Sequence, residues 1–178
     1  MTSTVDNAPQ LDWQVAVADT LVAAGITVAA YVPDTRLQGV LSLLADNGVR
    51  MRSLTREEEC IGYAAGQRIA GKRPVVLMQS SGLGNSLNAL GSLAVPYRLG
   101  LPLVVSMRGG LGEANPSQVP LGRSAVQLLS TLGIQAFSVR TAAAAAQVTA
   151  GAVTLAFRAG ECAALMLEPE LGGGREGS

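Results

Sequence analysis

The chain has 178 residues, enough to bury a core without disulfides or a structural metal, so we expect one main domain. Its 13 basic and 13 acidic residues balance to a formal net charge of +0, which argues against nucleic acid and anionic membranes as partners. Charged residues are only 15% of the chain and hydrophobic residues 48%, which predicts that a partner protein covers part of the surface.

Several site types are excluded by missing residues or patterns. The sequence contains no histidine, the usual general base of serine and cysteine hydrolases and the commonest transition-metal ligand, so hydrolytic triads and histidine-bound metal sites are excluded and no metal ligand is predicted. Cys60 and Cys162 lie in apolar stretches and are expected to be buried thiols. No apolar run is long enough to cross a membrane, and residues 1–10 lack the pattern of a signal peptide, which predicts a cytoplasmic protein.

Helix and strand patterns alternate along the chain. Residues 1–10 and 169–178 are expected to be flexible tails around one domain over 11–168. Expected helices cover 11–25, 37–47, 56–70, 85–99, 123–132 and 141–159. Expected strands cover 27–32, 49–54, 74–79, 101–106, 134–139 and 163–167. The strands are too apolar to be half exposed, so we predict an α/β fold: a three-layer α/β/α arrangement around a mostly parallel, six-stranded sheet.

Three consecutive glutamates open the helix expected over 56–70. Thr55 can cap this helix with Glu58 in a capping box, and acids in the first turn favour the helix dipole. Glu57 is not explained in this way, because the residues at helical spacing from it are apolar: Ile61, Ala64 and Ala65. A carboxyl group on the apolar side of a helix can share a proton with a ligand nitrogen, while a solvated helix start is the alternative.

The strand expected over 74–79 runs into Ser81-Gly-Leu-Gly-Asn85, which we interpret as a glycine turn. Such a turn lets a backbone approach a ligand closely, and it can also cradle a phosphate at a helix start. The string lacks the third glycine of a dinucleotide fingerprint and the lysine of a Walker loop. A plain structural turn remains the alternative.

Residues 107–122 show no helical or strand periodicity and are expected to form a long functional loop. Arg108 directly follows an apolar strand, the place where a parallel sheet puts its ligands. A guanidinium group suits the paired oxygens of a sulfonate or phosphonate. Arg123 is expected only to begin the next helix, and a surface loop with solvated arginines is the alternative.

Three motifs, in this order, resemble the pyrimidine-binding domain of thiamine-diphosphate enzymes. They are Thr55-Arg-Glu-Glu-Glu59, Met78-Gln79 with Ser81-Gly-Leu-Gly-Asn85, and Glu113-Ala-Asn-Pro-Ser-Gln-Val-Pro-Leu-Gly-Arg123. Val32-Pro-Asp34 also resembles the turn after the first strand of that domain. Within these enzymes the combination looks most like the alpha subunits of the sulfopyruvate and phosphonopyruvate decarboxylase family, over roughly residues 11–168.

The resemblance implies a role for named residues. Glu57 would be the catalytic residue, hydrogen-bonded to ring nitrogen N1′ of the aminopyrimidine of thiamine diphosphate. The residues implied to bind the cofactor are Pro33, Glu57, Ser81, Gly82, Gly84 and Asn85. The residues implied to bind a small anionic 2-oxo acid are Asp34, Asn85, Arg108 and Gln118.

The resemblance also implies a partner, because the sequence has no Gly-Asp-Gly, the string that marks the half of such enzymes that binds the metal and diphosphate. A beta subunit would hold the diphosphate and Mg²⁺, in a hetero-oligomer that is inactive without it. The implied carboxy-lyase reaction converts 3-sulfopyruvate to sulfoacetaldehyde and carbon dioxide, with phosphonopyruvate as the alternative substrate. A non-catalytic ligand-binding module or regulatory paralogue is the alternative from another class.

Overall fold

The structure, a computed structural model, describes residues 12–172 and contains one sheet of six parallel strands. The strands lie in the order β2-β1-β3-β4-β6-β5. Their bounds are β1 (Val28–Tyr31), β2 (Arg50–Ser53), β3 (Pro74–Gln79), β4 (Pro102–Ser106), β5 (Gln135–Val139) and β6 (Ala163–Leu167). The α/β fold predicted from the alternating pattern is confirmed, and the sheet is wholly parallel.

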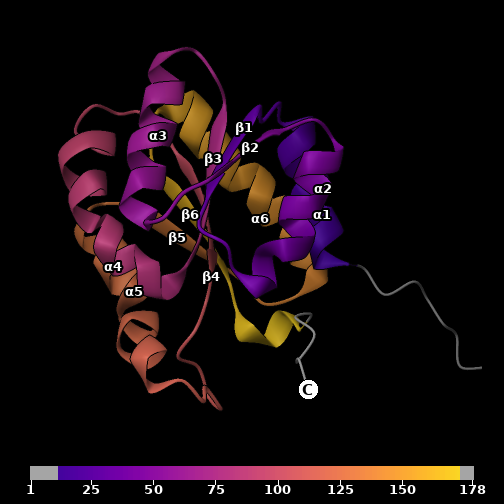
Figure 1. Cartoon of the computed structure of the whole chain (residues 1–178), viewed down its shortest axis with the longest axis vertical. Helices are drawn as coiled ribbons and strands as arrows, with labels where there is room; N and C mark the ends of the chain where they lie inside the picture. The colour runs from indigo at the N-terminus through magenta and orange to yellow at the C-terminus, as the bar shows by residue number, and fades with distance from the viewer. Residues whose placement is uncertain (1–11, 173–178) are drawn as a thin grey trace, which may run out of the picture.

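Helices cover both faces of this sheet (Figure 1). One face packs against α1 (Trp13–Ala23), α2 (Gln38–Asp46) and α6 (Ala142–Thr154). The other face packs against α3 (Glu57–Ile69), α4 (Ser80–Ala89) and α5 (Val119–Thr131). Each face therefore has its own hydrophobic core, as expected for a three-layer arrangement.

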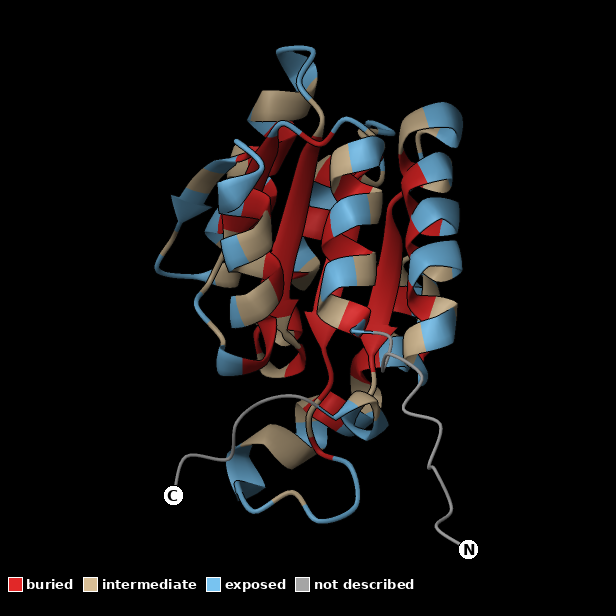
Figure 2. Ribbon diagram, turned by 90° about the vertical axis from the view of Figure 1, so that its right-hand side faces the viewer, coloured by how far each residue is buried: buried red, intermediate tan, exposed pale blue. Residues whose placement is uncertain are grey.

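Burial differs between the centre and the edges of the sheet. The central strands β1, β3, β4 and β6 are buried along nearly their whole length, while the edge strands β2 and β5 are largely open to solvent (Figure 2). The expectation that strands are too apolar to be half exposed thus holds for the central strands and is wrong for the edges. On β2 the charged side chains of Arg50 and Arg52 disfavour pairing of this open edge with a strand of another molecule.

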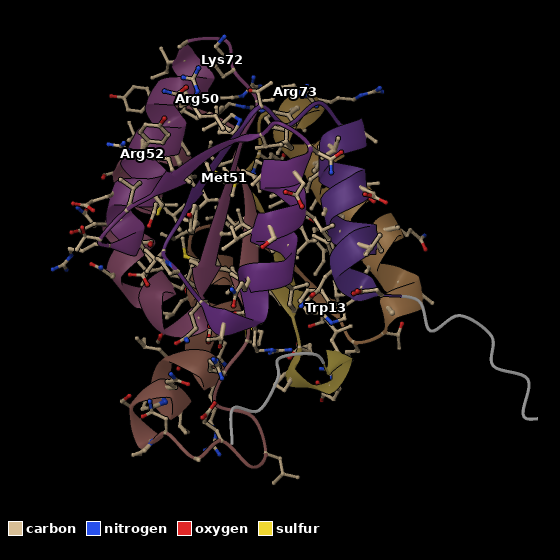
Figure 3. All side chains as sticks on the ribbon, turned by 45° about the vertical axis from the view of Figure 1, so that its right-hand side comes forward. Trp13, Arg50, Met51, Arg52, Lys72 and Arg73 are labelled. Carbon is tan, nitrogen blue, oxygen red and sulfur yellow. The ribbon has the colours of Figure 1, made fainter. Side chains whose placement is uncertain are left out.

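The two ends of the strands face different surroundings. Arg50, Lys72 and Arg73 lie near the amino ends of β2 and β3, at one end of the molecule (Figure 3). The long segment after β4 lies at the opposite end (Figure 1). The carboxyl ends of the strands, where α/β sheets bind ligands, are therefore on the side of this segment.

Two helices, α4 and α5, begin earlier in the chain than predicted. Residues 80–85 form the first turns of α4 and not a glycine turn, and a π-helical turn, Leu90–Ala94, follows α4. Helix α5 begins at Val119 instead of Arg123, so the irregular segment is shorter than expected. Pro120 lies in the first turn of α5, where its missing N–H group costs no hydrogen bond, and this explains the early start.

The ends of the chain are described only in part. The tail expected over 1–10 lies outside the described residues, as does most of the tail expected over 169–178. The described start of the second tail is a short 3-10 helix, Pro169–Leu171, and the carbonyl of Gly172 accepts a hydrogen bond of 3.0 Å from Trp13 Nε1. Figure 3 shows Trp13 beside this segment. None of the helices within residues 12–172 combines the length and apolarity that crossing a membrane requires.

Candidate active site

The predicted site residues lie at the carboxyl ends of neighbouring strands. Pro33 and Asp34 follow β1, Glu57 begins the helix after β2, and Arg108 follows β4. The segment Ser81–Asn85 lies in the first turns of α4, directly after β3. Because all strands are parallel and β1, β3 and β4 are adjacent, these positions share one edge of the sheet.

The start of α3 is held by Glu59. Its carboxylate accepts hydrogen bonds of 3.1 Å from the backbone N–H groups of Thr55 and Arg56, with Arg56 in the N-cap position. The capping box predicted with Thr55 and Glu58 is therefore wrong by one residue. This register makes Glu57 the first residue of the helix, half-buried, at the positive end of the helix dipole.

The carboxyl group of Glu57 lies against Gly82 in the first turn of α4. A β-carbon built on Gly82 would be 2.1 Å from Glu57 Cδ and 2.2 Å from Glu57 Oε1. The carboxylate accepts no hydrogen bond from any other described residue. A negative group is therefore held at the start of two helices, with its oxygens available to a ligand.

The other predicted residues of α4 make contacts of their own. Ser81 Oγ donates a hydrogen bond to Gln79 Oε1. Asn85 Oδ1 accepts a hydrogen bond of 3.0 Å from Arg56 Nη2, which ties α4 to the start of α3. A β-carbon on Gly84 would lie 3.0 Å from the δ-carbons of Leu121, so Gly84 packs α4 against α5. Asn85 thus borders the start of α3, while Gly84 faces another helix.

A second cluster joins the ends of β1 and β4. Asp34 Oδ1 accepts a hydrogen bond of 3.3 Å from Arg108 Nη2, and Asp34 Oδ2 accepts one from Ser106 Oγ. The Asp34 side chain is 5% exposed and that of Arg108 25%. Arg108 Nε is buried and finds no hydrogen-bond acceptor within the described residues. The guanidinium of Arg108 is therefore partly paired, with a donor left for an anion.

A residue that the sequence analysis did not single out joins this cluster. Arg36 is only 9% exposed, and its guanidinium donates to the carbonyls of Met107 and Glu168 at 3.0 and 2.9 Å. Burial lowers the pKa of Arg36 and the charge of Arg108 adds to this, while Asp34 acts in the opposite direction. Its position two residues after the Pro33-Asp34 turn is the signal that could have revealed it.

The carboxylate of Glu113 holds the segment after Arg108 in place through backbone hydrogen bonds. Glu113 accepts hydrogen bonds from the N–H groups of Asn115 and Gly109, at 3.1 and 3.3 Å. These hydrogen bonds lower the pKa of Glu113, and they fold the segment back toward the end of β4. Gln118, predicted to bind substrate, ends the 3-10 helix Pro116–Gln118 and is half-buried.

A cleft of about 520 Å³ opens beside Pro33 and Asp34, between α2 and the edge of the sheet. Gln38, Leu41 and Met51 also line it, which places it on the face opposite to α3 and α4. It therefore reaches the Asp34 cluster but not Glu57. Within the described residues no group of three Cys, Asp or Glu side chains is arranged to hold a metal ion.

Several known proteins are similar to this chain in sequence. Residues 12–121 match the family described as thiamine pyrophosphate enzyme, N-terminal TPP binding domain. Sulfopyruvate decarboxylase subunit alpha of Methanothermobacter thermautotrophicus is 39% identical over 146 residues, 82% of this chain and 88% of the relative. The subunit alpha of Methanocaldococcus jannaschii is 37% identical over 127 residues, 71% of this chain and 75% of the relative.

Longer proteins are similar over part of their length. A phosphonopyruvate decarboxylase of Streptomyces viridochromogenes is 33% identical over 111 residues, 61% of this chain and 28% of the relative. A solved 2-oxoglutarate:ferredoxin oxidoreductase from Magnetococcus marinus shares the fold, with a TM-score of 0.70 and 16% identity, over 91% of this chain and 30% of that chain. The family match covers more than half of the chain, and the resemblance stated from the motifs is confirmed. The chain belongs to the thiamine pyrophosphate enzyme family, as a protein of its N-terminal TPP-binding domain type.

Proposed function

We propose that this chain is the alpha subunit of a thiamine-diphosphate-dependent 2-oxo acid decarboxylase that converts 3-sulfopyruvate to sulfoacetaldehyde and carbon dioxide. The family and the relatives named sulfopyruvate decarboxylase subunit alpha support this assignment. Phosphonopyruvate is the second candidate substrate, because two phosphonopyruvate decarboxylases are 33% identical over shorter stretches.

The carboxylate of Glu57 is the observation that carries the proposal. It lies at the start of α3 against Gly82, and no other described residue donates a hydrogen bond to it. These residues fit an aminopyrimidine ring, because a carboxylate in this position can hold a proton at ring nitrogen N1′, and Gly82, which has no β-carbon, leaves room for that carboxylate at the start of α4. Ser81 and Asn85 would border the ring from the same helix, while Pro33 would approach from the end of β1.

Glu57 would act by holding and returning the proton at N1′. Bound thiamine diphosphate supplies the nucleophilic carbon and the electron sink that 2-oxo acid decarboxylation requires. Glu57 lies at the start of α3 and against the start of α4, where a protonated N1′ would donate a hydrogen bond to its carboxylate. The apolar residues that follow on α3, Cys60 and Ile61, are fully buried.

The Asp34 and Arg108 cluster would bind the substrate. Arg108 offers a buried Nε donor that the described residues do not use, and a sulfonate oxygen is a suitable acceptor. Asn85 and Gln118 would add amide contacts to the carboxylate or the oxo group.

A second subunit would complete the enzyme. The sequence has no Gly-Asp-Gly, so we assign the diphosphate and Mg²⁺ to a beta-subunit partner in a hetero-oligomer. The cytoplasmic location stays a prediction from the sequence.

Co-expression tests the proposal. The chain and a candidate beta subunit that carries Gly-Asp-Gly are purified together and assayed with sulfopyruvate, phosphonopyruvate and pyruvate. We expect carbon dioxide and sulfoacetaldehyde only with both subunits, thiamine diphosphate and Mg²⁺. Preference for phosphonopyruvate would select the second candidate, and ligand binding without turnover would favour a non-catalytic module.

A further inference from the structure

The peptide group that joins Met107 to Arg108 is held on both sides. Its carbonyl oxygen accepts a hydrogen bond of 3.0 Å from Arg36 Nη1, and its N–H group donates one of 3.0 Å to Ser80 Oγ. Arg36 and Ser80 are both buried, and Ser80 is the first residue of α4. This peptide is therefore fixed between the turn after β1 and the helix that carries Gly82.

The next peptide group along the chain has no room to move. A β-carbon on Gly122 of α5 would lie 2.0 Å from the carbonyl oxygen of Arg108. Gly109 has a φ of +78°, and a β-carbon there would lie 2.9 Å from the backbone of Val119. The backbone on either side of Arg108 is thus clamped, so the direction of its Cα–Cβ bond follows from the orientation of these peptides, and Asp34 holds the guanidinium at the far end.

Arg36 also fixes the neighbouring strand. Its Nη2 donates to the carbonyl of Glu168 at 2.9 Å, and its Nη1 lies 3.5 Å from the carbonyl oxygen of Leu167. One guanidinium therefore ties the carboxyl ends of β4 and β6 together. A guanidinium can do this because its donors lie in a rigid fork, whereas a lysine ammonium reaches one carbonyl at a time.

We propose that Arg36 is a positioning residue that sets the Met107–Arg108 peptide and thereby aims the Arg108 guanidinium at the anionic tail of the substrate. The inference rests on the proposed function. Arg36 itself is buried with its donors on backbone carbonyls, so it acts through Arg108 and not by contact with the substrate. The donor that benefits is Arg108 Nε, which has no acceptor within the described residues.

The test uses the alpha–beta complex with Arg36→Met and Arg36→Lys, and Arg158→Met as a control. Arg158 is exposed on the π-helical turn Leu155–Ala159, so its loss removes one positive charge at a distance from the site. The measurements are kcat and KM for sulfopyruvate, and inhibition constants for 3-sulfopropanoate and for pyruvate, which lacks the tail. Thermal unfolding of each complex shows whether the variants fold.

We expect Arg36→Met to raise KM for sulfopyruvate and the inhibition constant of 3-sulfopropanoate by about tenfold or more, the effect of one misplaced charged hydrogen bond. The inhibition constant of pyruvate should change by less than about twofold, and Arg36→Lys should fall between wild type and Arg36→Met. Arg158→Met should match the wild type.

Each contrary result has its own meaning. Equal weakening of pyruvate and 3-sulfopropanoate would show a general structural role and overturn the inference, and so would unchanged constants in a folded Arg36→Lys or Arg36→Met complex. If Arg36→Met does not fold, the lysine variant decides alone. A wild-type complex that fails to decarboxylate sulfopyruvate would instead overturn the proposed function on which the inference rests.

Discussion

The carboxyl group of Glu57 occupies the space that a β-carbon on Gly82 would need. A β-carbon there would lie 2.1 Å from Glu57 Cδ, far inside van der Waals contact. The Glu57 carboxyl group can therefore lie at the start of α4 because residue 82 is glycine. This contact places the carboxylate at the first turns of both α3 and α4.

Replacing Gly82 with alanine should displace Glu57. The added methyl group collides with the carboxyl group at the end of the flexible Glu57 side chain, so the carboxylate shifts; we expect turnover of the complex to fall by about tenfold or more, with stability changed by less than about 1 kcal/mol. Gly151→Ala is the matched control, because Gly151 is exposed in α6 and a β-carbon there meets no described atom within 4 Å. That variant should gain up to about 1 kcal/mol and keep full activity. A fully active Gly82→Ala complex would contradict the assigned contact.

Removal of the Glu57 charge tests the proposed catalytic role of this carboxylate. Glu57→Gln keeps the size of the side chain but cannot hold the proton at N1′, so turnover should fall by roughly 10²- to 10⁴-fold. Gel filtration should show an intact complex, because the side chain makes no hydrogen bond to another described residue. Glu58→Gln is the control: Glu58 forms an exposed 3.1 Å ion pair with Arg56, and its loss should leave turnover within about twofold. Full turnover in Glu57→Gln would remove the basis of the proposed function.

The sequence predicted the fold well because its strongest signals are local. Apolar runs with helical or strand periodicity mark each element of a parallel sheet, and the strand at Pro74–Gln79 has the bounds expected from its sequence. One of the errors lies where two interpretations of glycine compete. Ser81-Gly-Leu-Gly-Asn85 has the composition of a turn, but Gly82 and Gly84 serve close helix packing against Glu57 and Leu121. Only the three-dimensional contacts distinguish these roles.

The candidate site could be predicted in part. Glu57 stood out because capping does not explain it, and Arg108 because it ends an apolar strand. The pairing of Arg108 with Asp34 joins positions that are 74 residues apart, so it depends on strand order, which a single sequence does not reveal. Arg36 was missed for the same reason, since its hydrogen-bond partners are the carbonyls of Met107 and Glu168, which directly follow β4 and β6.

The negative charge of Asp34 should determine whether Arg108 binds a substrate tail with one negative charge or with two. Its carboxylate lies 3.3 Å from Arg108 Nη2, so it repels any second negative charge brought to that guanidinium. A phosphonate approaches two negative charges near neutral pH, as phosphate groups do, and a sulfonate carries one. Asp34→Asn should therefore raise the ratio of kcat/KM for phosphonopyruvate to that for sulfopyruvate by about tenfold.

The control for this prediction is Asp46→Asn, at the exposed end of α2, which should leave the ratio unchanged. Asp34→Asn should also lower the free energy of unfolding by roughly 1.5–3 kcal/mol, because Arg108 and Ser106 lose a charged partner. A ratio that stays constant or falls in Asp34→Asn would show that Arg108 does not bind the tail.

Cys60 offers a reporter for the charge on Glu57. Burial raises the pKa of the Cys60 thiol to about 12, and the negative charges of Glu57 and Glu59 add to the shift. Because the thiolate is the reactive form, we expect Cys60 to resist alkylation by iodoacetamide at pH 8 in the folded complex and to react after unfolding.

A raised pKa also means that the folded state holds the proton of Cys60 more tightly than the unfolded state does. The contribution of Cys60 to stability should therefore be complete below about pH 9 and decline as pH rises toward about 12.

Two variants separate this effect from the titration of other groups at high pH. Cys60→Ala should show a shallower loss of thermal stability above pH 9 than the wild type, although Cys162, whose pKa burial also raises, keeps part of the slope. Glu57→Gln removes one of the charges that disfavour the thiolate, so it should lower the pKa of Cys60, read from the thiolate absorbance of the folded complex as the pH is raised. An equal pKa of Cys60 in wild type and Glu57→Gln would mean that the carboxylate of Glu57 does not lie close enough to act on the thiol, and the geometry of the site would need revision.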